Sequence, residues 1–246
     1  MNQYPPMKVT NKESEDPLAV RHLSDRRIPS EGGEEIVEDF SYNFHAATFY
    51  ALSGPEFGGK SLLLHLLGLL AKPASGQVLM EGQPLSGLDL EELSEIRNRK
   101  FGFLFPAPFL LPSFNVLENV AMPLFKITQA SAREAKITTE AVLELIGISE
   151  IADIAVGQLR PVEEQLVALA RAVVHHPKIL IGENIGATLE DRVSRHLLSK
   201  MRQVCQRLGI TVIVTIAPGF KWERADVVLE VEHPRIEEVF NRIPHG

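Results

Sequence analysis

The chain has 246 residues, of which 45% are hydrophobic and 23% are charged. This balance excludes wholesale disorder, and the length predicts one large domain or a domain with an inserted lobe. The net charge of −7 disfavours nucleic acid as the main partner, because duplex-binding proteins are usually basic. The single cysteine, Cys205, excludes an internal disulfide and suits a reducing compartment. The longest strongly apolar stretch, 62–71, is too short to span a bilayer, so we expect a cytoplasmic protein that reaches a membrane only through a partner.

Residues 1–17 are polar and rich in proline, and we predict a flexible N-terminal tail there. Residues 18–246 are predicted to form a single domain in which short apolar runs alternate with helical patterns. We expect strands at 47–52, 78–80, 101–105, 179–181, 210–216 and 226–231, and helices at 61–71, 90–99, 162–174 and 190–208. The stretch 115–154 is rich in Ala, Glu and Leu and predicts a helical lobe of roughly 107–160. The alternation predicts an α/β fold with a mostly parallel sheet covered by helices.

A phosphate-binding loop is predicted between the first of these strands and the helix that follows it. Residues Gly54–Ser61 satisfy the pattern G-x-x-x-x-G-K-[ST], in which glycines let successive backbone N–H groups face a phosphate. Lys60 would reach the β- and γ-phosphates of ATP, and the Ser61 hydroxyl would bind magnesium. The predicted nucleotide contacts in this segment are Gly54, Gly58, Gly59, Lys60, Ser61 and Leu62. Whether the loop still holds nucleotide is a separate question, because Phe57 is bulky and Glu56 is acidic.

From residue 54 onward the order and spacing of motifs resemble the ATP-binding-cassette (ABC) ATPases, most closely the branch that serves lipoprotein release and macrolide efflux. One such motif is S-L-L-L-H-L-L-G at 61–68. The further segments that carry the resemblance are 73–78, 97–103, 110–124, 165–172, 177–181, 211–215 and 225–229. The resemblance implies a P-loop NTPase with a RecA-like core, an antiparallel β portion near the N-terminus and a helical lobe. It also implies ATP and magnesium as cofactors, a membrane permease as partner, and a second cassette in a homodimer or heterodimer.

Several catalytic positions of that family carry other residues here. The glutamine that binds magnesium and positions water corresponds to Pro106, which has no side-chain donor or acceptor. The general base corresponds to Asn184, whose neutral amide cannot take a proton from water. The γ-phosphate-sensing histidine corresponds to Ile216, and the aspartate of the inter-subunit loop corresponds to Glu190. Glu183, at the preceding acidic position, would reach a magnesium-bound water with one extra methylene group to accommodate.

The family signature, which binds the γ-phosphate held by the opposite subunit, is also altered. The signature L-S-G-G-[EQ] corresponds to residues 159–163, where Arg160, Pro161 and Val162 replace its serine and two glycines and Glu163 matches its last position. Pro161 removes a backbone N–H group and Val162 adds bulk. The adenine-stacking aromatic corresponds to Arg27, whose planar cation can stack on a base. A single change of this kind could be tolerated, or could reflect a misalignment. Several such changes occur together here, although the other motifs keep the order and spacing of the family, and this indicates relaxed selection on hydrolysis.

Together these features predict a catalytically degenerate nucleotide-binding subunit of a membrane ABC complex, which binds ATP weakly or without efficient hydrolysis. Each composite site of the family takes its phosphate loop from one subunit and its signature from the other. Pairing with an intact cassette would therefore rescue neither site fully. Two alternatives stay open: an active transport ATPase with divergent motifs, and a nucleotide-free scaffold. The sequence does not encode the transported substrate, the direction of transport or the choice between homodimer and heterodimer.

An apolar surface for the permease is predicted in the stretch that follows the third expected strand. Phe109, Leu110, Leu111 and Phe114 make this stretch more apolar than a solvent-facing loop requires. In the resembling branch the same stretch receives the coupling helix of a membrane subunit, which implies docking here. The alternative is that the two phenylalanines pack under the helical lobe.

The eight histidines are scattered along the chain and indicate no metal site. His65, on the helix after the phosphate loop, is expected to be a satisfied core histidine. Cys205 lies in a helical pattern and is expected to be packed rather than reactive.

Overall fold

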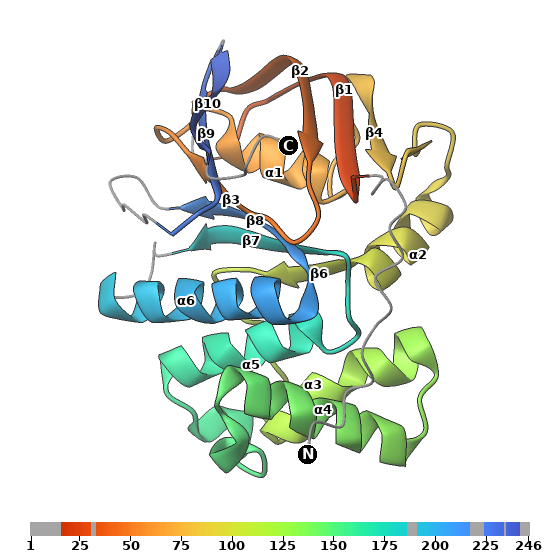
Figure 1. Cartoon of the computed structure of the whole chain (residues 1–246), viewed down its shortest axis with the longest axis vertical. Helices are drawn as coiled ribbons and strands as arrows, with labels where there is room; N and C mark the ends of the chain where they lie inside the picture. The colour runs from red at the N-terminus through yellow and green to blue at the C-terminus, as the bar shows by residue number, and fades with distance from the viewer. Residues whose placement is uncertain (1–15, 31–32, 186–190, 217–223, 234, 242–246) are drawn as a thin grey trace.

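The computed structural model describes residues 16–30, 33–185, 191–216, 224–233 and 235–241. These residues form stacked layers: an antiparallel sheet, one helix, a mostly parallel sheet, and then two layers of helices (Figure 1). Most of the predicted tail, 1–15, lies outside the described residues, and so does Glu190. Asp16 and Pro17, which the prediction included in the tail, contact the fold. Asp16 Oδ1 lies 2.7 Å from His45 Nδ1, and the Pro17 carbonyl accepts the Glu81 N–H at 3.3 Å.

The antiparallel β portion predicted near the N-terminus is confirmed. Its strand order is β2-β1-β4-β5, and every neighbouring pair is antiparallel. One face is buried, since β2 turns Val37, Phe40 and Phe44 inward and most of its polar residues outward. The strands are β1 (Leu18–Arg27), β2 (Glu35–Phe44), β4 (Ser75–Met80) and β5 (Gln83–Pro84).

The second sheet is the mostly parallel sheet that the alternation of strands and helices predicts. Its order is β10-β9-β3-β8-β7-β6; all pairs are parallel except the edge pair of β10 with β9. Every residue of β8 is buried, as expected for a strand covered on both faces. The sequence analysis did not predict β10. The strands are β3 (Phe49–Ser53), β6 (Phe101–Leu104), β7 (Ile179–Ile185), β8 (Thr211–Ile216), β9 (Val227–Glu232) and β10 (Arg235–Asn241).

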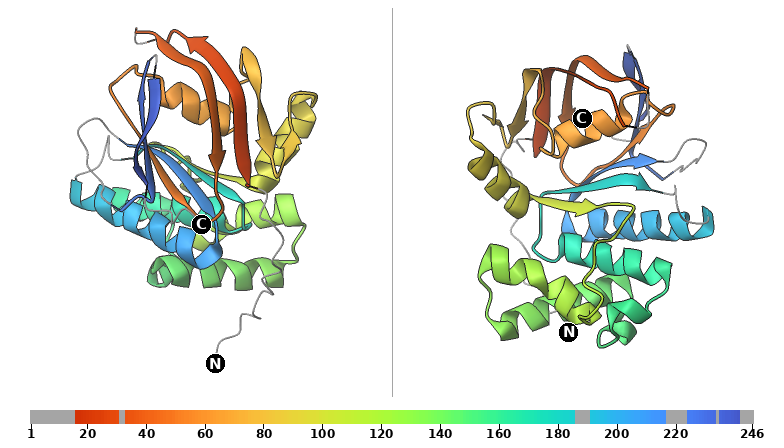
Figure 2. Two further views of the ribbon diagram at one scale, coloured as in Figure 1. Left: turned by 45° about the horizontal axis from the view of Figure 1, so that its top comes forward. Right: turned by 180° about the vertical axis from the view of Figure 1, so that it is seen from behind.

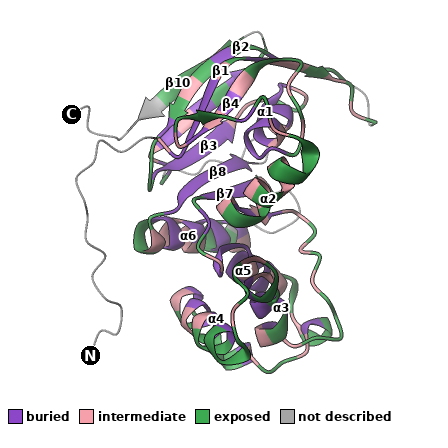
Figure 3. Ribbon diagram, turned by 90° about the vertical axis from the view of Figure 1, so that its right-hand side faces the viewer, coloured by how far each residue is buried: buried purple, intermediate pink, exposed green. Residues whose placement is uncertain are grey.

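Helix α1 (Lys60–Leu67) lies between the two sheets and buries its leucines against both (Figures 1 and 3). The predicted helix, 61–71, was too long. The chain leaves the helix at Gly68, whose N–H bonds to Leu64 O, and Leu69 then adopts a positive φ of 56°. A residue in the left-handed region ends a helix because it turns the chain out of the hydrogen-bond ladder.

Helices α3 to α6 cover the opposite face of the parallel sheet and extend below it, whereas α2 packs beside β6 and joins the same hydrophobic cluster as α1 through Leu93 and Ile96. Helices α5 and α6 lie next to the sheet, and α3 and α4 pack against them, as Figure 2 shows from two sides. No helix among the described residues is both long and apolar enough to cross a lipid bilayer. The helices are α2 (Leu90–Lys100), α3 (Val116–Pro123), α4 (Ala132–Ile146), α5 (Pro161–Val173) and α6 (Asp191–Leu208), with short turns η1 (Leu124–Thr128), η2 (Ser149–Ile151) and η3 (Val156–Gln158).

Candidate functional site

The candidate site lies at one edge of the parallel sheet, where four neighbouring strands present their carboxyl ends. The phosphate loop follows β3 and Pro106 follows β6, while Glu183 and Asn184 lie near the end of β7 and Ile216 ends β8. The parallel registers of these strands bring the four ends to one level. In open α/β sheets, ligands bind outside the carboxyl ends of the strands. The structure therefore brings together the predicted phosphate loop and the predicted catalytic positions.

The phosphate loop has the conformation that its glycines allow. Gly54 and Gly59 have φ values of 137° and 98°, and α1 begins directly after Gly59 with no acidic residue in its first turn. The helix N-terminus therefore offers backbone N–H groups to an anion. Lys60 is buried, and its Nζ donates to the carbonyl oxygens of Gly54 at 3.1 Å and Pro55 at 2.7 Å. Burial lowers the pKa of Lys60, against the opposing effect of the nearby Glu35 carboxylate.

Phe57 and Glu56, the two unusual residues of the loop, are accommodated at its outer side. Phe57 adopts a positive φ of 58°, and its ring packs on Gly33 in the connection between β1 and β2. A methyl group on Gly33 would lie 2.5 Å from Phe57 Cγ, so only glycine leaves room for the ring. Glu56 is exposed to solvent. The loop therefore keeps its backbone course despite the bulky residue.

Four polar side chains form a continuous network beside the phosphate loop. Arg27, at the end of β1, pairs with Glu35, at the start of β2: Arg27 Nε lies 3.0 Å from Glu35 Oε2, and Nη2 donates to the same oxygen. Arg27 Nη1 lies 2.8 Å from His65 Nδ1, and His65 Nε2 lies 2.8 Å from Glu183 Oε1. Arg27, predicted to stack on adenine, thus has its guanidinium engaged, whereas the next residue, Ile28, is exposed.

The donors in this network determine the form of His65. A guanidinium has donors only, so His65 Nδ1 accepts a hydrogen bond from Arg27 and His65 Nε2 carries the hydrogen that Glu183 accepts. His65 is satisfied, as expected, but it keeps some exposure to solvent instead of lying in the core, and it joins two charged residues. Sequence reasoning missed this role because the partners of His65 lie 38 and 118 residues away along the chain.

The ends of β7 and β8 offer no general base at the predicted position. Asn184 adopts a positive φ of 49°, its N–H donates to Thr215 Oγ1 at 2.7 Å, and its side chain is exposed. Ile216 is buried and pairs with Ile185. Neither an amide nor an aliphatic side chain can take a proton from water. Thr215 orients the backbone at Asn184, a role that the sequence analysis did not assign.

Helix α5 holds the backbone of the segment that follows β6, which includes Pro106. Gln165 Nε2 donates to Pro106 O at 2.7 Å. Arg171 donates from Nη2 to Pro108 O at 2.6 Å and from Nη1 to Phe109 O at 2.8 Å, and burial lowers the pKa of its guanidinium. These side chains donate hydrogen bonds to backbone carbonyl groups of the segment. The prolines keep the segment out of a β-sheet, so these carbonyl groups have no strand partner. Sequence reasoning quoted both residues within a motif but gave them no contact.

Asn119 of α3 fixes the rest of this segment, which we name the docking segment (residues 105–115). Asn119 is fully buried, and its Oδ1 accepts the Leu111 N–H at 2.8 Å. Its Nδ2 donates to Leu111 O at 3.1 Å, Phe114 O at 3.3 Å and Asn115 O at 3.0 Å. One buried amide therefore holds the segment through four backbone groups. The sequence analysis missed it.

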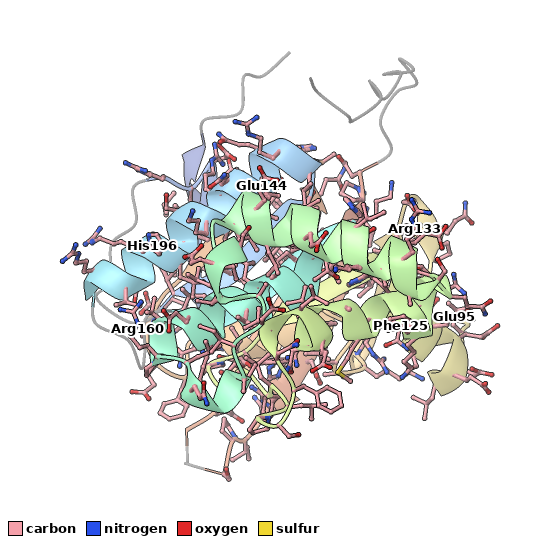
Figure 4. All side chains as sticks on the ribbon, turned by 90° about the horizontal axis from the view of Figure 1, so that it is seen from below. Glu95, Phe125, Arg133, Glu144, Arg160 and His196 are labelled. Atoms are coloured by element: carbon pink, nitrogen blue, oxygen red, sulfur yellow. The ribbon has the colours of Figure 1, made fainter. Side chains whose placement is uncertain are left out.

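The docking segment exposes three of its four predicted docking residues. Phe109 is 71% exposed, Leu111 39% and Phe114 41%, and we name these three side chains the apolar surface. Leu110 instead packs against the main hydrophobic core. Phe125 of η1 adds a further exposed aromatic side chain to the helical layer (Figure 4). The two predicted phenylalanines therefore do not lie hidden under the helices.

The four positions that correspond to the family signature lie at the start of α5. Pro161 is the first helical residue, where the missing N–H costs nothing, and Val162 is half-buried. Arg160 is exposed (Figure 4), and its Nη2 lies 2.5 Å from Glu163 Oε1, while its backbone N–H donates to Glu163 Oε2 at 2.8 Å. The bond from the Arg160 guanidinium lowers the pKa of Glu163. Arg160, which replaces the serine of the signature, thus forms an ion pair with Glu163 at this helix start.

The residues present fit a phosphate group better than a magnesium ion. The retained loop, Lys60 and the N-terminus of α1 suit a phosphate. Magnesium requires near-octahedral oxygen ligands, and at the expected positions Ser61 keeps its hydroxyl, Pro106 offers no side-chain ligand and Glu183 Oε1 is engaged by His65. Among the residues that the structure covers, no group of three or more His, Cys, Asp or Glu side chains is placed to hold a metal ion. The expected magnesium ligands are therefore reduced to the Ser61 hydroxyl and the second oxygen of Glu183.

A phosphate loop between β3 and α1, with an antiparallel sheet above and a helical layer below, defines a P-loop NTPase of the ATP-binding-cassette type. A family model described as ABC transporter matches residues 37–183. The chain belongs to the ABC transporter family.

Within this family the chain is similar to the lipoprotein-releasing branch. It is 36% identical over 223 residues to the lipoprotein-releasing system ATP-binding protein LolD of Bordetella pertussis, which covers 89% of this chain and 95% of that protein. It is 33% identical over 190 residues to the methionine import ATP-binding protein MetN of Cupriavidus metallidurans, covering 77% of this chain and 55% of that protein. The predicted resemblance is therefore confirmed.

Solved cassettes have the same fold. The cassette MJ0796, whose dimer was solved in a post-hydrolysis state with ADP and phosphate, superposes with a TM-score of 0.75 at 24% identity, covering 90% of this chain and 98% of that chain. The protein cbiO1 of Clostridium perfringens, part of the transporter complex cbiONQ, superposes with a TM-score of 0.79 at 22% identity, covering 91% and 87%. These likenesses confirm the predicted cassette fold.

Proposed function

We propose that this chain is a nucleotide-binding subunit of an ABC-type membrane complex that binds ATP without efficient hydrolysis. The observation that carries the proposal is a contrast at one sheet edge: the phosphate loop and Lys60 are retained, whereas Asn184 stands where a base is needed. Loss of a general base lowers a rate by about 10²–10⁴. Pro106 and Ile216 remove two further polar groups from the same edge. The names of the similar proteins, which are ATP-binding subunits, support the nucleotide-binding part of the proposal.

Calorimetric titration of the purified chain with ATP tests this function. We expect saturable binding at micromolar to low-millimolar affinity that is lost in Lys60→Ala, because the ammonium group no longer meets the phosphates. Lys72→Ala is the matched control, since Lys72 lies outside the loop. No heat and no thermal stabilisation at several millimolar ATP would favour the nucleotide-free scaffold. Steady phosphate release that disappears in Lys60→Ala would favour an active ATPase instead.

The apolar surface supports a second part of the proposal, docking on a permease subunit. Phe109, Leu111 and Phe114 are exposed on a segment whose backbone is firmly held, which is the arrangement expected of a preformed partner site. Docking would place the chain at the inner face of the cell membrane. We expect Phe109→Asp with Phe114→Asp to abolish recovery of the permease in a pull-down, and Ile137→Asp, an equally exposed site on α4, to leave it unchanged. Equal recovery by all variants would refute docking at this surface.

A second cassette is the other partner that we propose, in a homodimer or a heterodimer. The exposed Arg160 and its partner Glu163 stand at the helix start that faces the opposite phosphate loop in the family arrangement. The dimeric structure of MJ0796 supports this assembly. Sedimentation of the chain with and without ATP tests this assembly. A dimer that forms only with ATP is expected for the homodimer. A monomer at all concentrations would exclude the homodimer, so that only the heterodimer would stand.

A further inference from the structure

Glu183 is already engaged by other side chains of the chain. Its Oε1 accepts the His65 Nε2–H at 2.8 Å, and both side chains are about four-fifths buried, with relative exposures of 20% and 22%. A hydrogen bond to a carboxylate is stronger than one between neutral groups, and partial burial strengthens it further. The carboxylate is therefore held in a defined position by His65.

His65 is itself held and polarised from its other side. Arg27 Nη1 donates to His65 Nδ1 at 2.8 Å, and the nearly buried Glu35 fixes Arg27 through the bonds from Nε and Nη2. A positive charge at the acceptor nitrogen of an imidazole makes the opposite N–H a better donor, because hydrogen bonds in a chain polarise one another. The Arg27 cation is itself paired with Glu35, so the four side chains keep one net negative charge. What His65 supplies to Glu183 is a hydrogen-bond donor, the role that a magnesium-bound water would otherwise fill.

We propose that His65 takes the place of a magnesium ion as the partner of Glu183, so that the site binds the metal-free form of a nucleoside triphosphate. The inference rests on the proposed nucleotide binding and adds which species is bound. Lys60 and the N-terminus of α1 would meet the phosphates. His65 acts through Glu183 and is a positioning residue. Ser61 would provide a single protein ligand, so any bound magnesium ion would depend mainly on phosphate and water oxygens.

The test is the ratio of two nucleotide affinities, one measured with excess magnesium and one with EDTA, by calorimetry on the full-length chain. For the wild type we expect the two to agree within about twofold. In His65→Leu and Glu183→Asp the carboxylate loses its donor, and we expect magnesium ATP to bind about tenfold more tightly than free ATP. His65→Gln keeps a donor toward Glu183 and an acceptor for Arg27, so it should retain the wild-type ratio.

The matched control is His22→Leu, because His22 makes a similar 2.7 Å contact to a carboxylate, Asp39, on the exposed part of the antiparallel sheet. It should behave as the wild type, and a general loss of stability would not change the affinity ratio. If His65→Leu does not fold, Glu183→Asp provides the same test, since it shortens the carboxylate by one methylene group. A tenfold preference of the wild type for magnesium ATP overturns the inference but leaves nucleotide binding intact. Absence of binding under both conditions overturns both.

Discussion

The phosphate-loop edge and the docking segment differ in which of their groups already have hydrogen-bond partners within the chain. Beside the phosphate loop, the side chains that would meet a ligand are bonded to each other or to the loop, as in Glu183 with His65 and Lys60 with Pro55. In the docking segment the backbone is bonded, through Asn119 and α5, and the side chains that would meet a partner are exposed. The first region must exchange contacts in order to bind, whereas the second is already in place. The fold thus combines an exposed apolar surface on a fixed backbone with a phosphate loop whose neighbouring polar side chains are already paired.

The largest effect should come from Asn119, which holds the docking segment. We expect Asn119→Ala to lower the free energy of unfolding by about 3 kcal/mol, because several buried backbone groups lose their partner at once. Urea denaturation measures this change. Asn98→Ala on the exposed side of α2 is the matched control and should change the free energy by less than about 0.5 kcal/mol. A loss below about 1 kcal/mol in Asn119→Ala would mean that the segment is held elsewhere.

A smaller loss is expected for Arg171, which holds the same segment from α5. Arg171→Leu removes the donors to Pro108 O and Phe109 O and should lower the free energy of unfolding by about 2 kcal/mol. Hydrogen exchange should also become faster within 105–115, since the segment would open locally. Arg133→Leu, an exposed arginine of α4 (Figure 4), serves as the control. Unchanged exchange in Arg171→Leu would contradict the idea of a preformed segment.

At the phosphate edge, restoring one residue should achieve little. We expect Asn184→Glu to raise phosphate release by less than about tenfold, because Pro106 and Ile216 still leave the attacking water without polar partners. A colorimetric phosphate assay measures this rate, with Lys60→Ala in the same background as the blank. A gain of several hundredfold would show that the missing base alone limits hydrolysis.

The smallest effect is a pH dependence at the start of β6, the end of this strand that lies away from the docking segment. Burial lowers the pKa of His175, whose Nε2–H donates to Phe101 O at 3.1 Å while its buried Nδ1 has no hydrogen-bond partner among the described residues. The folded state therefore favours the neutral ring, which contributes stability above the ordinary pKa of 6.5 that is lost as the pH falls below it. The free energy of unfolding should fall between pH 7.5 and 5.5, with a shallower slope in His175→Gln. Equal slopes would exclude His175 as the cause.

The sequence predicted what local pattern and spacing determine. The phosphate loop follows from its motif, the buried β8 from its β-branched run, and α5 from its helical pattern with a proline at the first turn. It did not predict the pairings of His65 and Arg171, because their partners lie far away along the chain. The partners of Asn119 lie within eight residues, but they depend on the course of an irregular loop that no periodic pattern specifies. Lone polar residues in otherwise apolar helices were the available signal for His65 and Asn119. A polar side chain in such a position is expected to have a hydrogen-bond partner, but the sequence does not show which residue that partner is.

The contact of Phe57 with Gly33 has a consequence for how this sequence can change over evolutionary time. Because any side chain at Gly33 would collide with the aromatic ring, the two positions are expected to vary together among the descendants of this chain. Replacing the ring at 57 by a small residue would remove this collision, but a larger residue at 33 would still have to adopt a positive φ of 81°. Substitutions at Gly33 and Phe57, although 24 residues apart along the chain, are therefore expected to depend on each other.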